Sequence, residues 1–94
     1  MKIFDVWAEW CAPCKKFGPI FEHVAKEFPT IEFVKINADT DEGFEFLNKY
    51  GIRGIPTILM LDDENKVVFQ HSGILSEANL RTLVQFHKSR NREQ

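Results

Sequence analysis

The chain has 94 residues, which is enough for one small domain covering residues 1–94 but not for two. Hydrophobic residues make up 44% and charged residues 28%, a balance that is typical of a folded domain and excludes an intrinsically disordered chain. The formal net charge of −2 provides no broad attraction to nucleic acid or to an anionic membrane surface. We therefore expect neither of these as a partner.

The N-terminal segment bears on the compartment. Asp5 interrupts its apolar stretch, and no small-residue cleavage site follows, which argues against a secretory signal. No apolar run elsewhere approaches the ~20 residues that cross a bilayer. We therefore expect a cytoplasmic protein. In such a reducing compartment, two neighbouring cysteines indicate catalysis or metal binding more often than a structural cross-link.

In chain order, the apolar pattern predicts a strand over Lys2–Trp7, a helix over residues 11–28 and a strand over residues 31–37. It then predicts a short helix that begins at Asp39 or Thr40 and ends at Gly51, followed by a strand over residues 56–61. The chain continues with a polar turn over residues 62–66, a strand over residues 67–71 and a last helix capped by Ser76. The chain is polar from Lys88 onward, and we expect that end of the last helix to fray.

This order of elements predicts the fold class. The first strand, helix and strand require a parallel pair joined by a right-handed crossover. The last two strands are separated by a short polar turn, which is typical of an antiparallel hairpin. We therefore expect an α/β protein with a four-stranded mixed sheet and three helices, in the order β-α-β followed by α-β-β-α.

The two cysteines lie where the first strand gives way to the first helix, in the segment Trp10-Cys11-Ala12-Pro13-Cys14. Backbone N–H groups at a helix N-terminus lack intrahelical partners, and the helix dipole is positive there. Both effects stabilise a thiolate on Cys11, which we expect to be the attacking nucleophile. Cys14 lies one turn deeper on the same face, close enough to form a disulfide and to act as the resolving thiol. Pro13 suits the first turn because its missing N–H would be unpaired there.

Half of a zinc site is the alternative interpretation of such a cysteine pair. Zinc is usually held by four protein ligands, and the chain has only two cysteines. The three histidines, His23, His71 and His87, are scattered, with none at the paired spacing of metal ligands. We therefore expect no metal and no bound cofactor, and we assign no role to the histidines.

The active-site segment resembles that of the thioredoxin family. The likeness covers nearly the whole chain and is carried by Trp10-Cys11-Ala12-Pro13-Cys14-Lys15 after a strand containing Asp5, by Pro19, by Lys35-x-Asn37-x-Asp39, by Tyr50-Gly51-Ile52-Arg53-Gly54-Ile55-Pro56-Thr57 and by Gly73. One Cys-x-x-Cys motif is only moderately specific, but the same motif followed later by Gly-Ile-Pro-Thr is highly specific. The resemblance implies the thioredoxin fold in a minimal form and a thiol–disulfide oxidoreductase.

The resemblance also implies roles for two charged residues inside apolar strands, which complete the catalytic set of Cys11, Cys14, Asp5 and Lys35. From the pattern alone, the side chain of Asp5 could equally point to solvent. The resemblance implies instead that its carboxylate is buried behind the cysteines, where it takes a proton from Cys14, and that it pairs with Lys35. Each residue supports the other because an unpaired buried charge is costly.

A substrate-binding rim around Cys11 is expected from the same resemblance. It implies a cis peptide bond between Ile55 and Pro56, where base rates alone favour an ordinary trans proline. The backbone of Ile55 would then face Cys11 and pair with an extended substrate segment. The expected rim consists of Trp10, Ala12, Pro13, Ile55, Pro56, Gly73 and Ile74.

The sequence departs from the usual family pattern in three respects, one of which is the polar turn over residues 62–66, slightly longer than usual and without Gly. The family usually has a further strand and helix before the first strand seen here, so the strand over residues 31–37 should be a sheet edge, which invites pairing with another chain. We therefore expect a monomer or a weak dimer. Ala12 stands where the commonest motif has Gly, and this difference should change the reduction potential only slightly.

These observations predict an enzyme in which Cys11 attacks a partner disulfide and Cys14 resolves the mixed disulfide. Its partners would be disulfide-containing proteins of the cytosol, and the resemblance implies recycling by a flavin-dependent thioredoxin reductase that uses NADPH. The first alternative is a docking module of a larger complex, in which redox turnover is incidental. A disulfide-forming oxidant is the second alternative, and it needs an oxidising compartment.

Overall fold

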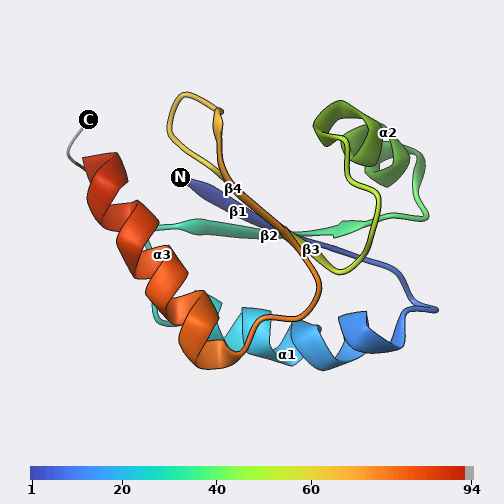
Figure 1. Ribbon diagram of the computed structural model, residues 1–94, viewed down its shortest axis with the longest axis horizontal. Coiled ribbons are helices and arrows are strands. Elements are labelled where there is room, and N and C mark those ends of the chain that lie inside the picture. Colours follow the sequence, from blue (N-terminus) through green and yellow to red (C-terminus); the bar gives the residue numbers. More distant parts are fainter. Residues whose placement is uncertain (93–94) are drawn as a thin grey trace.

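The computed structural model describes residues 1–92. Its elements in chain order are β1 (Lys2–Trp7), α1 (Ala12–Ala25), β2 (Glu32–Asn37), α2 (Asp41–Tyr50), β3 (Thr57–Leu61), β4 (Val67–Ser72) and α3 (Glu77–Arg92) (Figure 1). Every predicted element is present in the predicted order. None of the three helices within residues 1–92 combines the length and apolar content that a membrane crossing requires.

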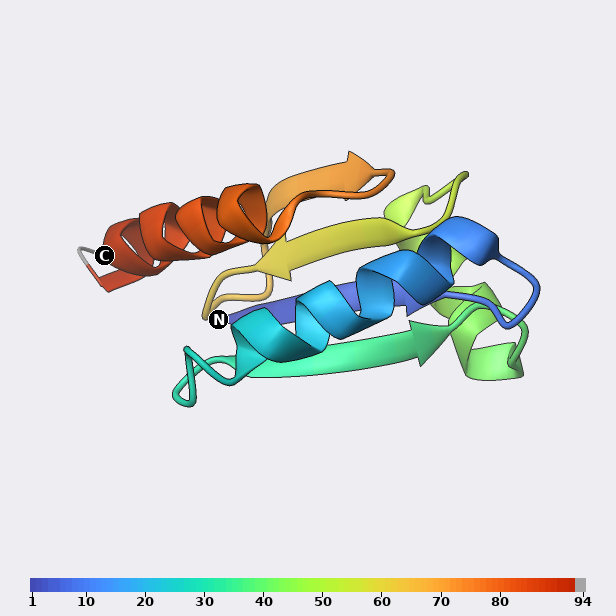
Figure 2. The same cartoon turned by 90° about the horizontal axis from the view of Figure 1, so that it is seen from below.

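The four strands form one mixed sheet in the order β2-β1-β3-β4. β1 and β2 are parallel, whereas the β1–β3 and β3–β4 pairs are antiparallel. α1 and α3 cover one face of this sheet, and α2 covers the other (Figure 1, Figure 2). The predicted fold class is therefore confirmed. β2 forms an edge of the sheet, as predicted for the strand over residues 31–37.

Alternation along the strands divides the core into two layers. Ile3 belongs to the larger layer, which packs under α1 and α3, while its neighbour Phe4 belongs to the smaller layer under α2. On the α2 side, the ring centroid of Phe4 lies 4.9 Å from that of Phe46, which in turn lies 4.8 Å from that of Tyr50. β3 is buried along its whole length because it lies inside the sheet and has a helix on both faces.

α1 ends three residues earlier than the predicted boundary at residue 28. The N–H groups of Glu27 and Phe28 donate to the carbonyls of Val24 and Ala25, each three residues back, so the chain tightens after Ala25. This tighter turn directs Phe28 into the core, where it is buried just before Pro29 stops further helix. The apolar pattern could not separate these last residues from the helix because Phe28 continues its buried face.

The predicted fraying of α3 from Lys88 is wrong within the described residues, since the helix continues to Arg92. The ammonium of Lys88 lies 5.7 Å from the ring centroid of Phe28, and the guanidinium of Arg90 lies 5.7 Å from that of Phe86. Such cation–π contacts stabilise the last turns. Positive charge near a helix C-terminus is also favourable for the helix dipole. The polar pattern concealed these contacts with aromatic rings.

Gly43, in the first turn of α2, provides a test of how tightly this helix is docked. A Cβ atom at this position would collide with the backbone carbonyl of Asn37. We expect Gly43→Ala to lower the free energy of unfolding by about 2 kcal/mol or more, because the clash with rigid backbone outweighs the gain of about 1 kcal/mol in helix propensity. Urea denaturation followed by circular dichroism measures this change.

Glu45→Ala, at an exposed position of α2, is the matched control and should change the free energy of unfolding by less than about 0.5 kcal/mol. Equal stability of the two variants would contradict the close approach of Gly43 to Asn37.

Candidate active site

Cys11 occupies the N-cap position of α1, with φ −95° and ψ 104°. The backbone N–H of Cys14 donates to the Cys11 sulfur at 3.3 Å, and Pro13 lies in the first turn of the helix as predicted. The two cysteines are joined by a disulfide, with their Cα atoms 5.3 Å apart. The first turn of α1 therefore holds one sulfur against unpaired helix N–H groups and the second sulfur within bonding reach of the first.

The surroundings of the two sulfurs differ, although both cysteines are buried in the disulfide. The Cys11 sulfur lies 3.8 Å from the carbonyl oxygen of Ile55, on the side of the exposed rim. Cys14 instead lines a cavity that also contains Asp5 and that opens to solvent past the exposed Lys15 and Glu22. The predicted division into an attacking and a resolving cysteine therefore rests on these neighbours, because burial alone does not separate the two residues.

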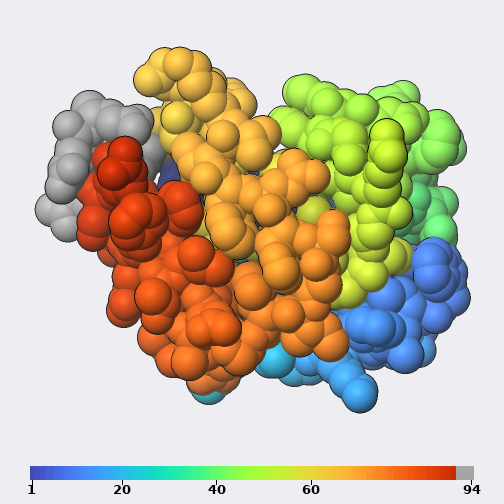
Figure 3. All heavy atoms as spheres, in the orientation of Figure 1, coloured from blue at the N-terminus to red at the C-terminus, as the bar shows by residue number. Residues whose placement is uncertain are grey.

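The loop that carries Pro56 contacts the cysteine turn. The peptide bond between Ile55 and Pro56 is cis, as the resemblance implied. The carbonyl of Pro56 accepts a 2.7 Å hydrogen bond from the N–H of Gly73, whose φ of 113° is a conformation that other residues rarely adopt. Figure 3 shows the segment around residues 51–56 (yellow-green) against the segment that carries the cysteines (blue). Three predicted rim residues, Ile55, Pro56 and Gly73, are thus brought together beside Cys11.

The opposite side of the rim is formed by the turn itself. Trp10 is 71% exposed, and its indole N–H donates to a carboxylate oxygen of Asp39 at 3.0 Å. Ala12 and Pro13 are also exposed, as is Ile74 beyond Gly73. A groove of about 230 Å³ extends from Trp10 and Ile55 to Arg53, with Asp39 on its wall. Apolar surface of this kind beside a reactive sulfur suits the docking of other proteins.

Asp5 is completely buried, and neither of its carboxylate oxygens accepts a hydrogen bond from any residue in 1–92. Burial raises the pKa of Asp5 from its ordinary value of 3.8 to about 6; the positive charge of Lys35 acts to lower this pKa, and the negative charge of Glu22 acts to raise it. The carboxyl group therefore titrates close to neutral pH while it shares a cavity of about 260 Å³ with Cys14. This placement matches the predicted burial behind the cysteines.

The implied ion pair between Asp5 and Lys35 is not the one that forms. The two residues are direct partners in the register of β1 and β2, but the ammonium of Lys35 donates to the carboxylate of Glu22 at 3.0 Å. Glu22 is well exposed, so Lys35 can pair with it without losing its hydration, whereas pairing with Asp5 would bury the ammonium. The alternation pattern of the strands carries no information on this choice, because Glu22 lies on a different element, α1.

Glu22 and Gly18 are functional candidates that the sequence pattern did not indicate. Both lie on α1 and line the cavity next to Lys35 and Asp5. Their spacing from Cys14 was the available signal, because residues 14, 18 and 22 follow one another at intervals of four and share one face of a helix. Small and charged residues at intervals of four are common on helices, so this signal alone is weak.

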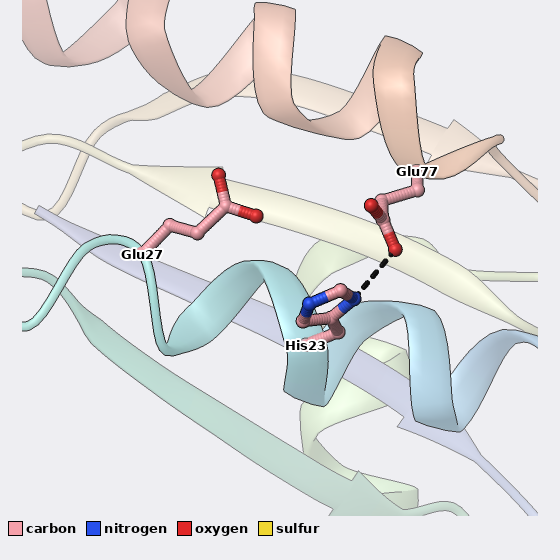
Figure 4. A group of neighbouring side chains, drawn as sticks. All are labelled: His23, Glu27 and Glu77. Carbon is pink, nitrogen blue, oxygen red and sulfur yellow. Dashed lines mark hydrogen bonds and ion pairs between the residues drawn. The ribbon is translucent and has the colours of Figure 1, made fainter.

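A second group of titratable side chains lies between α1 and α3, where His23, Glu27 and Glu77 approach one another (Figure 4). The guanidinium of Arg81 donates to Glu27 at 2.6 and 2.7 Å and to Glu77 at 2.8 Å, while Glu77 also contacts His23 at 2.7 Å. Hydrogen bonds from Arg81 lower the pKa of both glutamates, which therefore remain ionised. Since Arg81 already balances these carboxylates, we interpret the group as an ion-pair network that joins the two helices.

Comparison with known proteins agrees with this geometry, since the family model described as Thioredoxin matches residues 1–86. The chain belongs to the thioredoxin family. It is 38% identical over 82 residues to the thioredoxin of Mycoplasmoides gallisepticum, covering 87% of this chain and 79% of that relative. It is 43% identical over 82 residues to a thioredoxin-2 relative from Streptomyces coelicolor, again covering 87% of this chain but spanning only 59% of the length of that relative.

Solved structures show the same likeness. Fasciola hepatica thioredoxin superimposes with a TM-score of 0.81 at 36% sequence identity, covering 92% of this chain and 79% of that chain. A malaria parasite thioredoxin-2 superimposes with a TM-score of 0.83 at 21% identity, covering 92% of this chain and 82% of that chain, which demonstrates the shared fold. The cysteine turn and the cis proline loop described above therefore lie in a thioredoxin fold.

The raised pKa of Asp5 predicts how stability depends on pH. Between about pH 4 and pH 6 the folded state holds a proton on Asp5 that the unfolded chain has released, so wild-type stability falls as the pH rises through this range and stays lowered above it. Asp5→Asn removes this penalty. We expect the variant to exceed the wild type by about 3 kcal/mol in free energy of unfolding at pH 8 and by about 0.5 kcal/mol at pH 4, since each pKa unit corresponds to about 1.4 kcal/mol.

Denaturation curves of both proteins at a series of pH values measure this difference. Glu45→Gln, at an exposed position of α2, should differ from the wild type by a small amount that does not vary with pH. A stability difference for Asp5→Asn that is the same at pH 4 and pH 8 would show that Asp5 does not titrate between them.

Proposed function

We propose that the protein reduces disulfide bonds of other proteins by dithiol–disulfide exchange at Cys11 and Cys14. The observation that carries this proposal is the disulfide in the first turn of α1, with the Cys11 sulfur 3.8 Å from the backbone carbonyl of Ile55, a residue of the rim. A disulfide between residues only three positions apart closes a very short loop and stabilises the fold less than one that closes a long loop, which favours a chemical role over a structural one. Membership of the thioredoxin family supports the same activity.

The reaction begins from the reduced form, in which Cys11 is a thiolate. This thiolate attacks one sulfur of the partner disulfide, the partner S–S bond breaks, and the departing partner sulfur leaves as a thiolate that takes up a proton. Cys14 then loses its proton, for which the buried carboxylate of Asp5 is the proposed acceptor, and attacks the Cys11 sulfur. The mixed disulfide breaks, the second partner thiol is released, and the Cys11–Cys14 disulfide of the present structure forms. Two electrons have passed to the partner.

The substrate of this reaction is proposed to be an extended segment of a disulfide-containing protein. Trp10 and Ile74 supply exposed apolar surface on either side of Cys11, and the backbone of Ile55 is placed to pair with the segment in the manner of an added strand. Lys35 is proposed to act through Asp5. For renewed turnover the disulfide needs a two-electron donor, and the family resemblance suggests a flavin-dependent, NADPH-using thioredoxin reductase in the cytoplasm, with no cofactor bound to this chain itself.

The exposed rim also favours a second candidate function. The indole of Trp10, which is 71% exposed, could serve as a docking surface within a larger complex, and redox turnover would then be incidental. The two functions differ in what they require: replacing both cysteines with serine abolishes disulfide reduction, whereas a docking role would survive that replacement.

Cysteine variants test the main proposal in the insulin reduction assay, with dithiothreitol as the electron donor. We expect Cys11→Ser to reduce the rate to the background of dithiothreitol alone, because the remaining thiol, Cys14, is buried away from the rim where insulin would dock. Reduced Cys14→Ser, mixed with insulin after dithiothreitol has been removed, should instead accumulate a mixed disulfide with insulin, detectable by non-reducing electrophoresis, because the resolving thiol is lost. Asp5→Ala should retain the fold and slow reduction by about tenfold or more, because the proposed proton acceptor for Cys14 is lost.

Glu64→Gln, which alters an exposed ion pair in the β3–β4 turn, is a control that should leave the rate unchanged. Full activity of Cys11→Ser, or an unaltered rate for Asp5→Ala, would remove the corresponding residue from the mechanism.

We further propose that the β2 edge supports weak self-association, because its outer backbone groups are not used by the sheet in the described residues. Sedimentation equilibrium should then reveal a mass that rises with protein concentration, and amide exchange of β2 should slow in parallel. A constant monomer mass together with β2 amides as protected as those of β3 would contradict this expectation.

A further inference from the structure

The ammonium of Lys35 lies between two carboxylates that compete for it. Asp5 is its direct partner in the β1–β2 register and is completely buried, whereas Glu22 reaches it from α1 and is well exposed. The hydrogen bond goes to Glu22, at 3.0 Å, and both carboxylate oxygens of Asp5 are left without a hydrogen bond from the described residues. The exposed carboxylate thus binds the cation that the buried one would otherwise attract.

Gly18 creates the space for this ion pair. A Cβ atom at this position would lie 3.3 Å from the Lys35 ammonium nitrogen and 4.0 Å from the Glu22 carboxylate oxygen. The first of these separations is tighter than an ordinary van der Waals contact, so with a side chain at residue 18 the ammonium would have to shift by a few tenths of an ångström. Cys14, Gly18 and Glu22 follow one another on one face of α1, which puts the resolving cysteine, the gap and the exposed carboxylate in a single row along the cavity.

We propose that Glu22 is a positioning residue for disulfide reduction: it holds the Lys35 ammonium at the outer end of the cavity, so that Asp5 stays unpaired and can exchange a proton with Cys14. This inference rests on the proposed function for its chemistry. If Lys35 were released, it would turn to the remaining carboxylate, and a directly paired Asp5 would hold its negative charge firmly and be a weak proton acceptor at neutral pH.

Among residues 1–92, the charged groups that line the cavity with Asp5 come from two elements. β2 contributes Lys35, and α1 contributes Glu22 together with Cys14 and the more distant ammonium of Lys15, which pairs with Glu9 at 3.6 Å. On the other side, β3 presents the apolar Ile58 in register with Asp5. Removing Glu22 therefore acts on Asp5 in two ways, by loss of its own negative charge and by release of Lys35, and an experiment must separate them.

The experiment is a carboxyl carbon NMR titration of Asp5, applied to reduced protein with and without Glu22→Gln. We expect Glu22→Gln to lower the pKa of Asp5 by at least about one unit, the usual effect of an opposite charge that comes into contact. Glu64→Gln removes the same charge from an exposed ion pair in the β3–β4 turn and should leave the Asp5 titration unchanged. Thermal denaturation verifies that each variant is folded.

Repetition of the titration in a Lys35→Gln background separates the two effects. Without the ammonium, Glu22→Gln can act only through loss of its own charge, so we expect a shift of a few tenths of a unit, as for a solvent-screened carboxylate. Equal shifts in the two backgrounds, or no shift in either, would overturn the positioning role. Gly18→Ala, which crowds the Lys35 ammonium, should shift the Asp5 titration in the same direction as Glu22→Gln.

The second readout is the pH profile of insulin reduction. The acidic limb of this profile should move to lower pH in Glu22→Gln by the same amount as the Asp5 titration, and the plateau rate should fall because Asp5 is a weaker base. An Asp5 titration that moves while the rate profile stays fixed would overturn the role of Glu22 in the reaction. Absence of insulin reduction by the wild type would contradict the proposed function instead, and the titrations would still decide whether Glu22 positions Lys35.

Discussion

The hydrogen bond from the backbone N–H of Cys14 to the Cys11 sulfur is the contact on which the site depends. It makes a cysteine the N-cap of α1, so that the helix begins at the reactive residue. A sulfur at this position lies at the positive end of the helix dipole, near the start of the crossover from β1 to β2, where the chain leaves the sheet. The same turn that starts the helix therefore directs Cys11 toward the rim and Cys14 toward the buried carboxylate of Asp5.

Two kinds of interaction hold this turn in place. From one side, the segment containing Ile55 and Pro56 packs against the cysteines and is itself fastened by the hydrogen bond from Gly73 to Pro56. From the other, α1 is tied to α3 by the Arg81 network, whose carboxylates stay ionised because Arg81 donates to both of them. Partly exposed ion pairs contribute little energy individually, but a bidentate contact restricts geometry more than a single bond does. The first helix is thereby restrained at both of its ends.

The residues that carry the chemistry could be predicted because each combines an unusual residue type with a specific position. Cys11, Cys14 and Pro56 belong to motifs, and the burial of Asp5 followed from its place in an apolar strand once the family likeness was recognised. The partner of Lys35 could not be predicted in this way. That choice depends on a carboxylate from a different element and on the space left by Gly18, and neither appears in the pattern of a strand.

The fold was predictable for a related reason. Alternation along strands and the repeat along helices are local, so the elements and the mixed sheet could be inferred from short windows of sequence. The two wrong helix boundaries lie where contacts with residues distant in the sequence determine the end of the helix. α1 ends early because Phe28 turns into the core, and α3 extends because Lys88 lies over the ring of Phe28. Helix ends are generally the least predictable parts of a fold, because capping and packing compete there.

The close approach of Gly43 to Asn37 has an effect far from α2 itself. It lets the N-terminus of α2 lie directly on the loop after β2, where Thr40 bonds to the carbonyl of Asn37 and the side chain of Asn37 accepts the N–H of Asp39. Asp39 in turn holds the indole of Trp10 at the border of the reactive sulfur. Gly43, which is buried and has no side chain, thus influences through these contacts the orientation of Trp10, the most exposed aromatic group that an incoming protein would meet.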